Sequence, residues 1–219
     1  MMQNKNDKYW ILKLERCQKN LERNNFSAFV VHDCVEAKRI VMAEILPNIP
    51  VRSVSYGDSL TLHATNVLEE IRHNTDFEFV DTFAKNTPRE EILERRRQAL
   101  IVDLFFTGTN AVTESGQLVN LDMLGNRVAA ITFGPRNVVL FVGRNKIVSD
   151  LEAAMKRVKY QAAPMNAIRH ASLKTPCTET GQCADCNSSR RLCNIWSITE
   201  KSYPKGRITV VLINKDLGL

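Results

Sequence analysis

Residues 103–143 read DLFFTGTNAVTESGQLVNLDMLGNRVAAITFGPRNVVLFVG, a series of short apolar segments divided by turns. The turn sequences TGTN, LGN and GPRN are rich in Gly, Pro and Asn, which favour the tight backbone conformations of turns. The pattern predicts four short strands, one of which lies between LGN and GPRN. Strands of this kind form a sheet with other strands, so the rest of the chain must supply those strands and the helices that pack on the sheet.

The residues before this region alternate between helical and strand patterns. Residues 9–21 carry Ile11, Leu14 and Leu21 at the spacing of one helix face, and Cys17 between them is predicted to be a core thiol. Capping-box pairs mark further helix starts. Strands are predicted at residues 26–31, 51–56 and 77–81, and helices from Asp33 towards Pro47, after Ser59, and from the cap Thr87 to Leu100.

The residues after this region continue the alternation. Ser149 and Glu152 form another capping box, which predicts a helix through about residue 163, and residues 207–213 read as a last strand. Alternating strands and helices indicate an α/β fold with an open, mostly parallel sheet and helices on both faces. We expect one domain over residues 1–219, with residues 175–194 as an appended cysteine-rich loop.

Composition narrows the functional classes. Apolar residues make up 44% of the chain and charged residues 25%, and no apolar run is long enough for a transmembrane helix. The first residues lack the features of a signal peptide, so we expect a cytoplasmic protein with no membrane contact and with reduced thiols. Residues 151–219 hold 11 Lys and Arg against 5 Asp and Glu, but Trp196 is the one aromatic flanking the cysteines, so nucleic acid is not an expected partner.

Four cysteines lie in the spacing C-x5-C-x2-C-x6-C. This run is too compact for two zinc knuckles and is closer to iron–sulfur ligation, in which thiolates hold every iron. A 4Fe–4S cluster is the leading prediction; a zinc ion, or thiols without metal and a redox disulfide, are the alternatives. Lys174, Arg190 and Arg191 would offset the negative charge of four thiolates around a metal. The predicted ligands are Cys177, Cys183, Cys186 and Cys193.

Three polar segments follow or flank predicted strands and are expected to meet at the carboxyl edge of the sheet, where open α/β sheets gather ligands. Helix-start N–H groups and Arg127 could hold a carboxylate or phosphate, while Asn110 and Glu114 could bind a neighbouring hydroxyl, with Glu114 as its base. The alternatives are a plain helix cap at Ser59, an ordinary hairpin carboxylate at Glu114, and an Arg127 that pairs with Glu114 or Asp122. The predicted site comprises Gly57, Asp58, Ser59, Thr109, Asn110, Glu114, Gly116, Gly125, Asn126 and Arg127.

The combination of TN-A-TE-G, GNR, FGP and the cysteine run resembles the lactate-utilisation (LUD) domain proteins, in the branch that ends in a cysteine motif. The resemblance covers nearly the whole chain and implies an α/β fold similar to ribose-phosphate isomerases and CoA transferases. Some relatives act with iron–sulfur partner subunits in oxidising L-lactate to pyruvate. In CoA transferases of similar fold a Glu in a Glu-x-Gly context is the nucleophile, and Glu114-Ser115-Gly116 looks similar.

The sequence therefore leads to one main hypothesis and two rivals. The main hypothesis is a cytoplasmic redox protein of lactate or related hydroxy-acid utilisation, with an iron–sulfur or other metal centre for electron transfer. Its ligand would be a small organic acid or its carrier, and iron–sulfur or flavin subunits would be its redox partners. The rivals are a CoA- or sugar-phosphate-handling enzyme that uses Glu114 and a structural zinc, and a non-catalytic assembly subunit.

Overall fold

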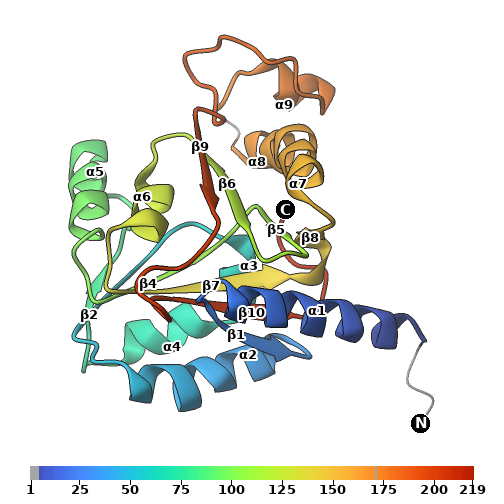
Figure 1. The fold of residues 1–219 in the computed structure, drawn as a ribbon. Coiled ribbons are helices and arrows are strands. Elements are labelled where there is room, and N and C mark those ends of the chain that lie inside the picture. Colours follow the sequence, from blue (N-terminus) through green and yellow to red (C-terminus); the bar gives the residue numbers. More distant parts are fainter. Residues whose placement is uncertain (1–4, 171) are drawn as a thin grey trace.

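The computed structural model describes residues 5–170 and 172–219 and is built on a six-stranded sheet in which every pairing is parallel (Figure 1). The strand order is β1-β10-β7-β4-β2-β3. The expected α/β fold with a largely parallel sheet is confirmed. The strands are β1 (Ser27–Val31), β2 (Ser53–Tyr56), β3 (Glu78–Val80), β4 (Leu104–Gly108), β7 (Asn137–Gly143) and β10 (Ile208–Ile213).

The central strands have the composition of strands that are covered on both faces. β7 reads NVVLFVG and β10 reads ITVVLI, and nearly all of their residues are buried. Continuous apolar runs of this kind are typical of parallel strands that have helices or another sheet on each side. β10 is the last strand in the chain, yet it pairs with β1 on one side and with β7 on the other.

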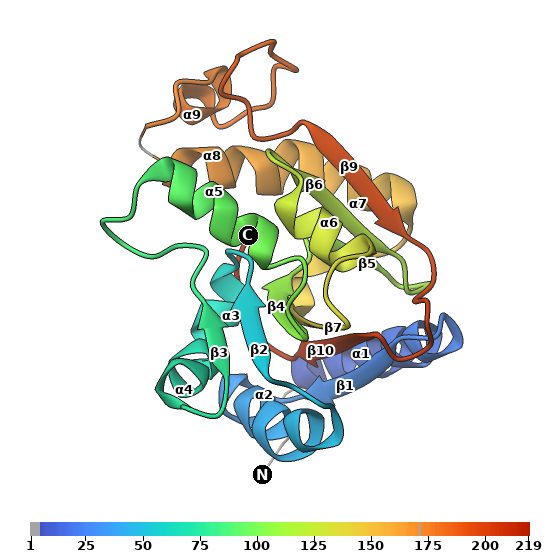
Figure 2. The same cartoon turned by 90° about the vertical axis from the view of Figure 1, so that its left-hand side faces the viewer.

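A second, four-stranded sheet has the order β8-β5-β6-β9. Its strands are β5 (Ala111–Thr113), β6 (Leu118–Asp122), β8 (Ile147–Val148) and β9 (Ile195–Thr199). Figure 2 shows β9 beside β6, with which it pairs in the antiparallel direction. The sequence predicted neither this separate sheet nor β9, whose residues are half-buried or exposed at a sheet edge.

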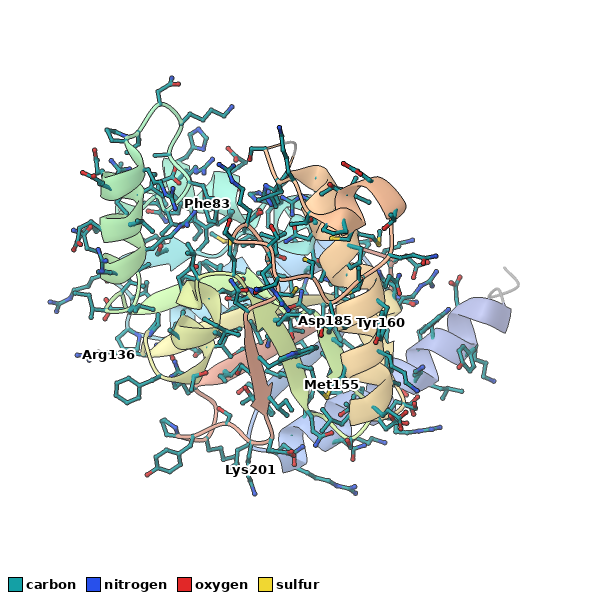
Figure 3. The ribbon with its side chains drawn as sticks, turned by 90° about the horizontal axis from the view of Figure 1, so that it is seen from above. Phe83, Arg136, Met155, Tyr160, Asp185 and Lys201 are labelled. Carbon is teal, nitrogen blue, oxygen red and sulfur yellow. The ribbon has the colours of Figure 1, made fainter. Side chains whose placement is uncertain are left out.

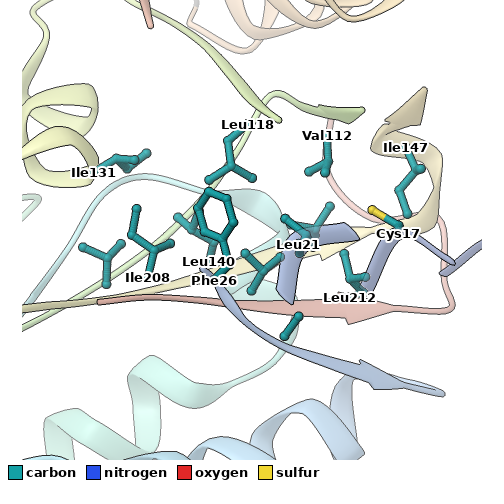
Figure 4. Close-up of a cluster of buried hydrophobic side chains, with 14 of the residues drawn as sticks. Cys17, Leu21, Phe26, Val112, Leu118, Ile131, Leu140, Ile147, Ile208 and Leu212 are labelled. Atoms are coloured by element: carbon teal, nitrogen blue, oxygen red, sulfur yellow. The ribbon is translucent and has the colours of Figure 1, made fainter. Parts of the chain in front are cut away.

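Helices cover both faces of the six-stranded sheet. One face packs against α2 (Cys34–Ile40), the π-helical turn η1 (Val41–Ile45), α3 (Leu60–Ala64) and α4 (Val67–His73). The other face packs against α1 (Lys5–Arg23), α6 (Asn126–Thr132) and the second sheet. In Figure 4, Cys17 and Leu21 of α1 lie in the same cluster as Leu140 and Leu212 of the sheet. Cys17 is fully buried, which confirms that it is a core thiol.

Residues 126–132 form helix α6, so the strand predicted between LGN and GPRN is wrong. Gly125 adopts a left-handed conformation, with φ +86°, that turns the chain before the helix. The Asp122 carboxylate then accepts a hydrogen bond from the Val128 backbone N–H at 3.1 Å, which satisfies a donor of the first turn. Asp122 lies four residues before the helix, so the apolar pattern of residues 126–132 carries no sign of this hydrogen bond.

Helix α5 (Arg89–Gln98) forms where it was expected, but its predicted cap is wrong. Pro88 rather than Thr87 occupies the N-cap position, and no side chain accepts a hydrogen bond there. The helix has no buried residue and carries three consecutive arginines in its last turn. It is therefore held to the domain by surface contacts.

The helix predicted after Ser149 also differs in its ends. Asp150 is the cap of α7 (Leu151–Arg157), and its carboxylate accepts a hydrogen bond from the Ala153 N–H at 2.8 Å. The helix continues through the π-helical turn η4 (Val158–Ala162) into α8 (Ala163–Arg169), past its predicted end. Among the described helices, none has both the length and the apolar character needed to cross a membrane.

Candidate functional site

A cavity of about 300 Å³ lies at the carboxyl edge of the six-stranded sheet. The segments that follow β2, β4 and β7 form one side of it, and α5, η4 and α8 contribute to the other. Phe83 lies beside α5 (Figure 3), where the Arg96 guanidinium stands 4.9 Å from the ring centroid. This is the edge at which open α/β sheets bind ligands.

Six of the ten predicted site residues line this cavity. The structure thus brings together residues from all three segments that the sequence placed at the sheet edge. The exception is the hairpin between β5 and β6, which lies elsewhere. Gly57 lies directly behind the lining: a Cβ at this position would stand 2.8 Å from Thr107 Oγ1, so only glycine permits the close approach. Gly125 supports the lining as the cap of α6. The lining residues are Asp58, Ser59, Thr109, Asn110, Asn126 and Arg127.

Glu114 and Gly116 do not line the cavity, so the expectation that Glu114 meets the other segments there is wrong. After β4 the chain enters β5 and runs away from the cavity, and four residues of extended chain span about 13 Å. The Glu114 carboxylate lies against α1, 3.2 Å from Lys13 Nζ and 3.6 Å from Arg16 Nη1. Gly116 supplies the left-handed residue of the β5–β6 turn.

The Ser59 turn forms a plain helix cap. The Ser59 hydroxyl accepts a hydrogen bond from the Leu62 N–H at 3.3 Å, and α3 is only five residues long. Its neighbour Asp58 forms an ion pair with Arg169 at 2.8 Å, while His63 Nε2 lies 3.4 Å from the other carboxylate oxygen. The alternative interpretation of this turn is therefore the one that the structure supports.

Arg127 is a structural clamp. Its Nε donates to Asp122 at 3.0 Å, and its Nη1 and Nη2 donate to the Gly108 carbonyl at 3.0 Å and the Asn110 side chain at 2.8 Å. Nη1 also donates to the Asn120 side-chain oxygen. The guanidinium thus ties the loop after β4 to β6. The sequence left pairing with Asp122 open as an alternative, and the structure supports that alternative. Together these hydrogen bonds give every nitrogen of the guanidinium a protein acceptor.

Lys146 lies in the lining of the cavity and was missed by the sequence analysis. It follows β7 by three residues, so the rule that selected the other segments would have found it. Only 5% of the residue is exposed, and Nζ donates to the Thr109 carbonyl at 3.2 Å. Burial, together with the positive charges of Arg157 and Arg127, lowers the pKa of Lys146 to about 7.

Two more buried donors surround the same loop. Arg157, in α7, donates to the Asn110 and Asn145 carbonyls at 2.7 and 3.1 Å, but its Nη2 is buried without a partner among the described residues. Asn120 Nδ2 is likewise buried without a described acceptor. Buried donors are nearly always satisfied in folded proteins. The loop after β4, part of which lines the cavity, is therefore surrounded by more buried donors than the described acceptors satisfy.

The four clustered cysteines line one narrow cavity of about 20 Å³, while Cys17 and Cys34 lie elsewhere. All are free thiols. Arg191 donates to the Cys186 carbonyl at 2.6 Å and the Cys193 carbonyl at 3.0 Å. Within residues 5–170 and 172–219, no three His, Cys, Asp or Glu side chains are arranged as a metal site. The cavity is lined by Cys177, Cys183, Cys186 and Cys193 together with Lys159 and Arg191.

The chemistry of this donor set fits a thiophilic metal. Four cysteines line one space, and two cations in the same lining could offset thiolate charge. Arg191 Nε is buried and has no acceptor among the described residues. A volume of about 20 Å³ holds roughly one small atom, so a four-iron cluster would require the segment to move outward. Asp185 (Figure 3) anchors that segment to η4 through an ion pair with Lys159 at 2.6 Å.

The cysteine cavity adjoins the larger one. Ala163 and Leu192 line both cavities, so their side chains form a shared wall. Figure 1 shows the cysteine segment with α9 (Pro176–Thr180) packed beside α8. An electron donor or acceptor held by the cysteines would therefore stand next to a molecule bound at the sheet edge.

Comparisons with known proteins agree with this architecture. The model of the LUD domain family matches residues 14–213. The crystal structure of a DUF162 family protein from Deinococcus radiodurans is similar with a TM-score of 0.50 and 13% identity, over 93% of this chain and 97% of that chain. At that identity the similarity concerns the fold alone. No curated protein matches the sequence.

Proposed function

The chain belongs to the LUD (lactate-utilisation) domain family, and we propose that it is a cytoplasmic redox protein of lactate or related hydroxy-acid utilisation. Family membership points to a function related to lactate utilisation. The proposal adds that the sheet-edge cavity binds the acid and that the four clustered cysteines hold a metal centre. The single observation that carries it is the shared wall of the two cavities, formed by Ala163 and Leu192.

The charge of the larger cavity favours an anionic ligand. Lys146 and Arg96 line it without an ion pair to a described residue, while the side-chain carboxylates of Asp58 and Asp122 are each paired with an arginine. A three-carbon acid fills only part of 300 Å³, so a larger acid or a carrier of the acid also fits this space. The protein's own groups would bind and orient the ligand, with the shared wall separating it from the cysteines.

The metal centre is proposed on the donor set. Four thiolates around a divalent ion, or around an oxidised 4Fe–4S core, carry a net charge of about −2, which Lys159 and Arg191 would offset. An iron–sulfur centre supplies electron transfer, whereas a zinc ion held by four thiolates is structural. Iron–sulfur or flavin subunits are the partners that fit the redox role. No observation favours the CoA-transferase rival, because Glu114 lies outside the cavity.

Anaerobic purification followed by iron, zinc and sulfide analysis tests the centre. A cluster gives about four irons and four sulfides per chain, and a zinc site gives about one zinc. Cys186→Ser should lower the metal content, while the matched control Cys34→Ser, in α2 away from the cavity, should not. Metal-free protein from anaerobic cells would overturn the metal centre. Unchanged stoichiometry in Cys186→Ser would exclude that residue as a ligand.

A further inference from the structure

Lys146 occupies an enclosed position in the lining of the sheet-edge cavity, where the proposed acid would bind. It ends the 3-10 turn η3 (Arg144–Lys146) directly after β7, and its Nζ makes one hydrogen bond, to the Thr109 carbonyl. The backbone of Gly218 closes one side, because a Cβ there would stand 3.1 Å from Nζ. An ammonium group has three donors, so the observed bond leaves two of them for a molecule in the cavity.

No described carboxylate serves as a counter-ion for this amine. Asp122 pairs with Arg127 and Asp58 pairs with Arg169, and neither forms an ion pair with Lys146. The charged groups that act on its pKa are instead cationic: Arg157 and Arg127 both lower it. The remaining titratable groups of the lining are Arg96, His170 and the terminal carboxyl group of Leu219, which forms no ion pair with Lys146. A buried charge without an opposite partner is costly, and the protein relieves that cost by releasing the proton.

We propose that Lys146 is the receptor for the carboxylate of the organic acid, and that it takes up a proton when the acid binds. The inference rests on the proposed function, because it assumes that an acid enters the cavity. The carboxylate supplies the missing counter-ion and accepts the free Nζ donors. The unpaired Nη2 of Arg157 and Nδ2 of Asn120 show the same excess of donors around this loop.

The protonation state of Lys146 determines how the affinity for the acid changes with pH. Without ligand, the pKa of Lys146 is lowered to about 7 by burial, so the amine is mostly neutral at pH 8.5. A bound carboxylate favours the charged form and raises the pKa. Affinity is therefore highest below pH 7 and falls about tenfold per pH unit above it, until the pH reaches the pKa of the complex.

Calorimetry of the whole chain measures this directly. Pyruvate and L-lactate are titrated at pH 8.5 in two buffers with different ionisation enthalpies, a pH at which imidazoles are ordinarily neutral. Uptake of about one proton per bound acid is expected. Lys146→Met should weaken binding by about 10- to 100-fold and abolish the uptake. Lys146→Arg keeps the charge at every pH and should bind without proton uptake.

Lys156→Met is the matched control, because Lys156 lies on the outer surface of α7 and pairs with Glu152 at 2.6 Å. It should bind as the wild type does. Wild-type binding without proton uptake at pH 8.5 would overturn the role of Lys146 and leave the acid cavity standing. Failure of the wild type to bind either acid at millimolar concentration would instead overturn the acid ligand of the proposed function. Because the first measurement uses unaltered protein, a variant that fails to fold does not affect it.

Discussion

Replacing Arg127 by Met should lower the stability of the fold, because Arg127 holds the edge of the cavity together. We expect this loss of stability, and not the loss of a ligand contact, to be its main effect. The guanidinium is buried with only 12% of its side chain exposed, and its partner Asp122 is 9% exposed. Methionine keeps much of the apolar volume but removes every donor. Asp122 then retains one hydrogen bond, from the Val128 N–H at 3.1 Å, and becomes a buried charge without a cation.

The expected loss is about 3 kcal/mol of unfolding free energy. Removing one member of a buried ion pair costs about 3–5 kcal/mol, and the remaining bond to Asp122 places this case at the lower end. For a chain of this size the melting temperature falls by about 2–4 °C per kcal/mol, which gives about 6–12 °C. Urea unfolding monitored by circular dichroism and a thermal scan measure both quantities.

A second variant separates the charge from the packing. Asp122→Leu combined with Arg127→Met removes the orphaned carboxylate and should recover part of the stability, because apolar replacements of buried pairs are often neutral. A loss below about 1 kcal/mol for Arg127→Met alone would refute the clamp. Unchanged stability together with lost binding of the acid would show instead that Arg127 holds the ligand.

Three further predictions concern other parts of the chain. Glu114→Gln should cost less than about 1 kcal/mol and leave acid binding by calorimetry unchanged, because its ion pairs are partly exposed; lost binding would contradict its placement outside the cavity. Cys17, whose pKa burial raises to about 12, should resist iodoacetamide in native protein while Cys34 reacts, as peptide mass spectrometry can show; equal labelling would be inconsistent with a closed core. Backbone N–H groups lower the pKa of Asp103, so its stabilising effect is complete above the unfolded value of about 3.9 and is lost as pH falls through the folded value. Urea midpoints of Asp103→Asn should depend less on pH between about 5 and 2, and parallel curves for the two proteins would exclude the effect.

Local sequence was sufficient to predict a strand wherever the composition of that strand showed whether its two faces are buried. β7 and β10 were predictable because their apolar runs suit only strands that are covered on both faces. The polar residues at the ends of β2 and β4 were then placed correctly by topology alone, since parallel strands bring their carboxyl ends to one edge. This argument located Asp58 and Asn110 in the cavity.

Distant contacts determined the remainder. Residues 126–132 are apolar and could suit a strand or a helix, and the Asp122 carboxylate selects the helix. β9 pairs only with β6, nearly eighty residues earlier, and its exposed edge position weakens any alternation of burial. Glu114 was misplaced because the direction of β5 depends on a second sheet. The sequence pattern of β5 alone does not show which strands it pairs with, and so it does not show the direction of β5.

The insertion of β10 between β1 and β7 has a consequence for how the chain is made. A ribosome releases β1 about 180 residues before β10, yet β1 joins the six-stranded sheet only through β10. Throughout that interval the apolar residues of β1 and one edge of β7 lack their partners, and unpaired apolar edges of nascent chains attract chaperones and one another. The six-stranded sheet therefore closes only after β10 has been synthesised, and it closes from the inside because β10 lies between β1 and β7. A protease cut or premature stop before residue 208 would not shorten this protein by one strand but would separate β1 and the α1 helix packed on it from the rest of the sheet.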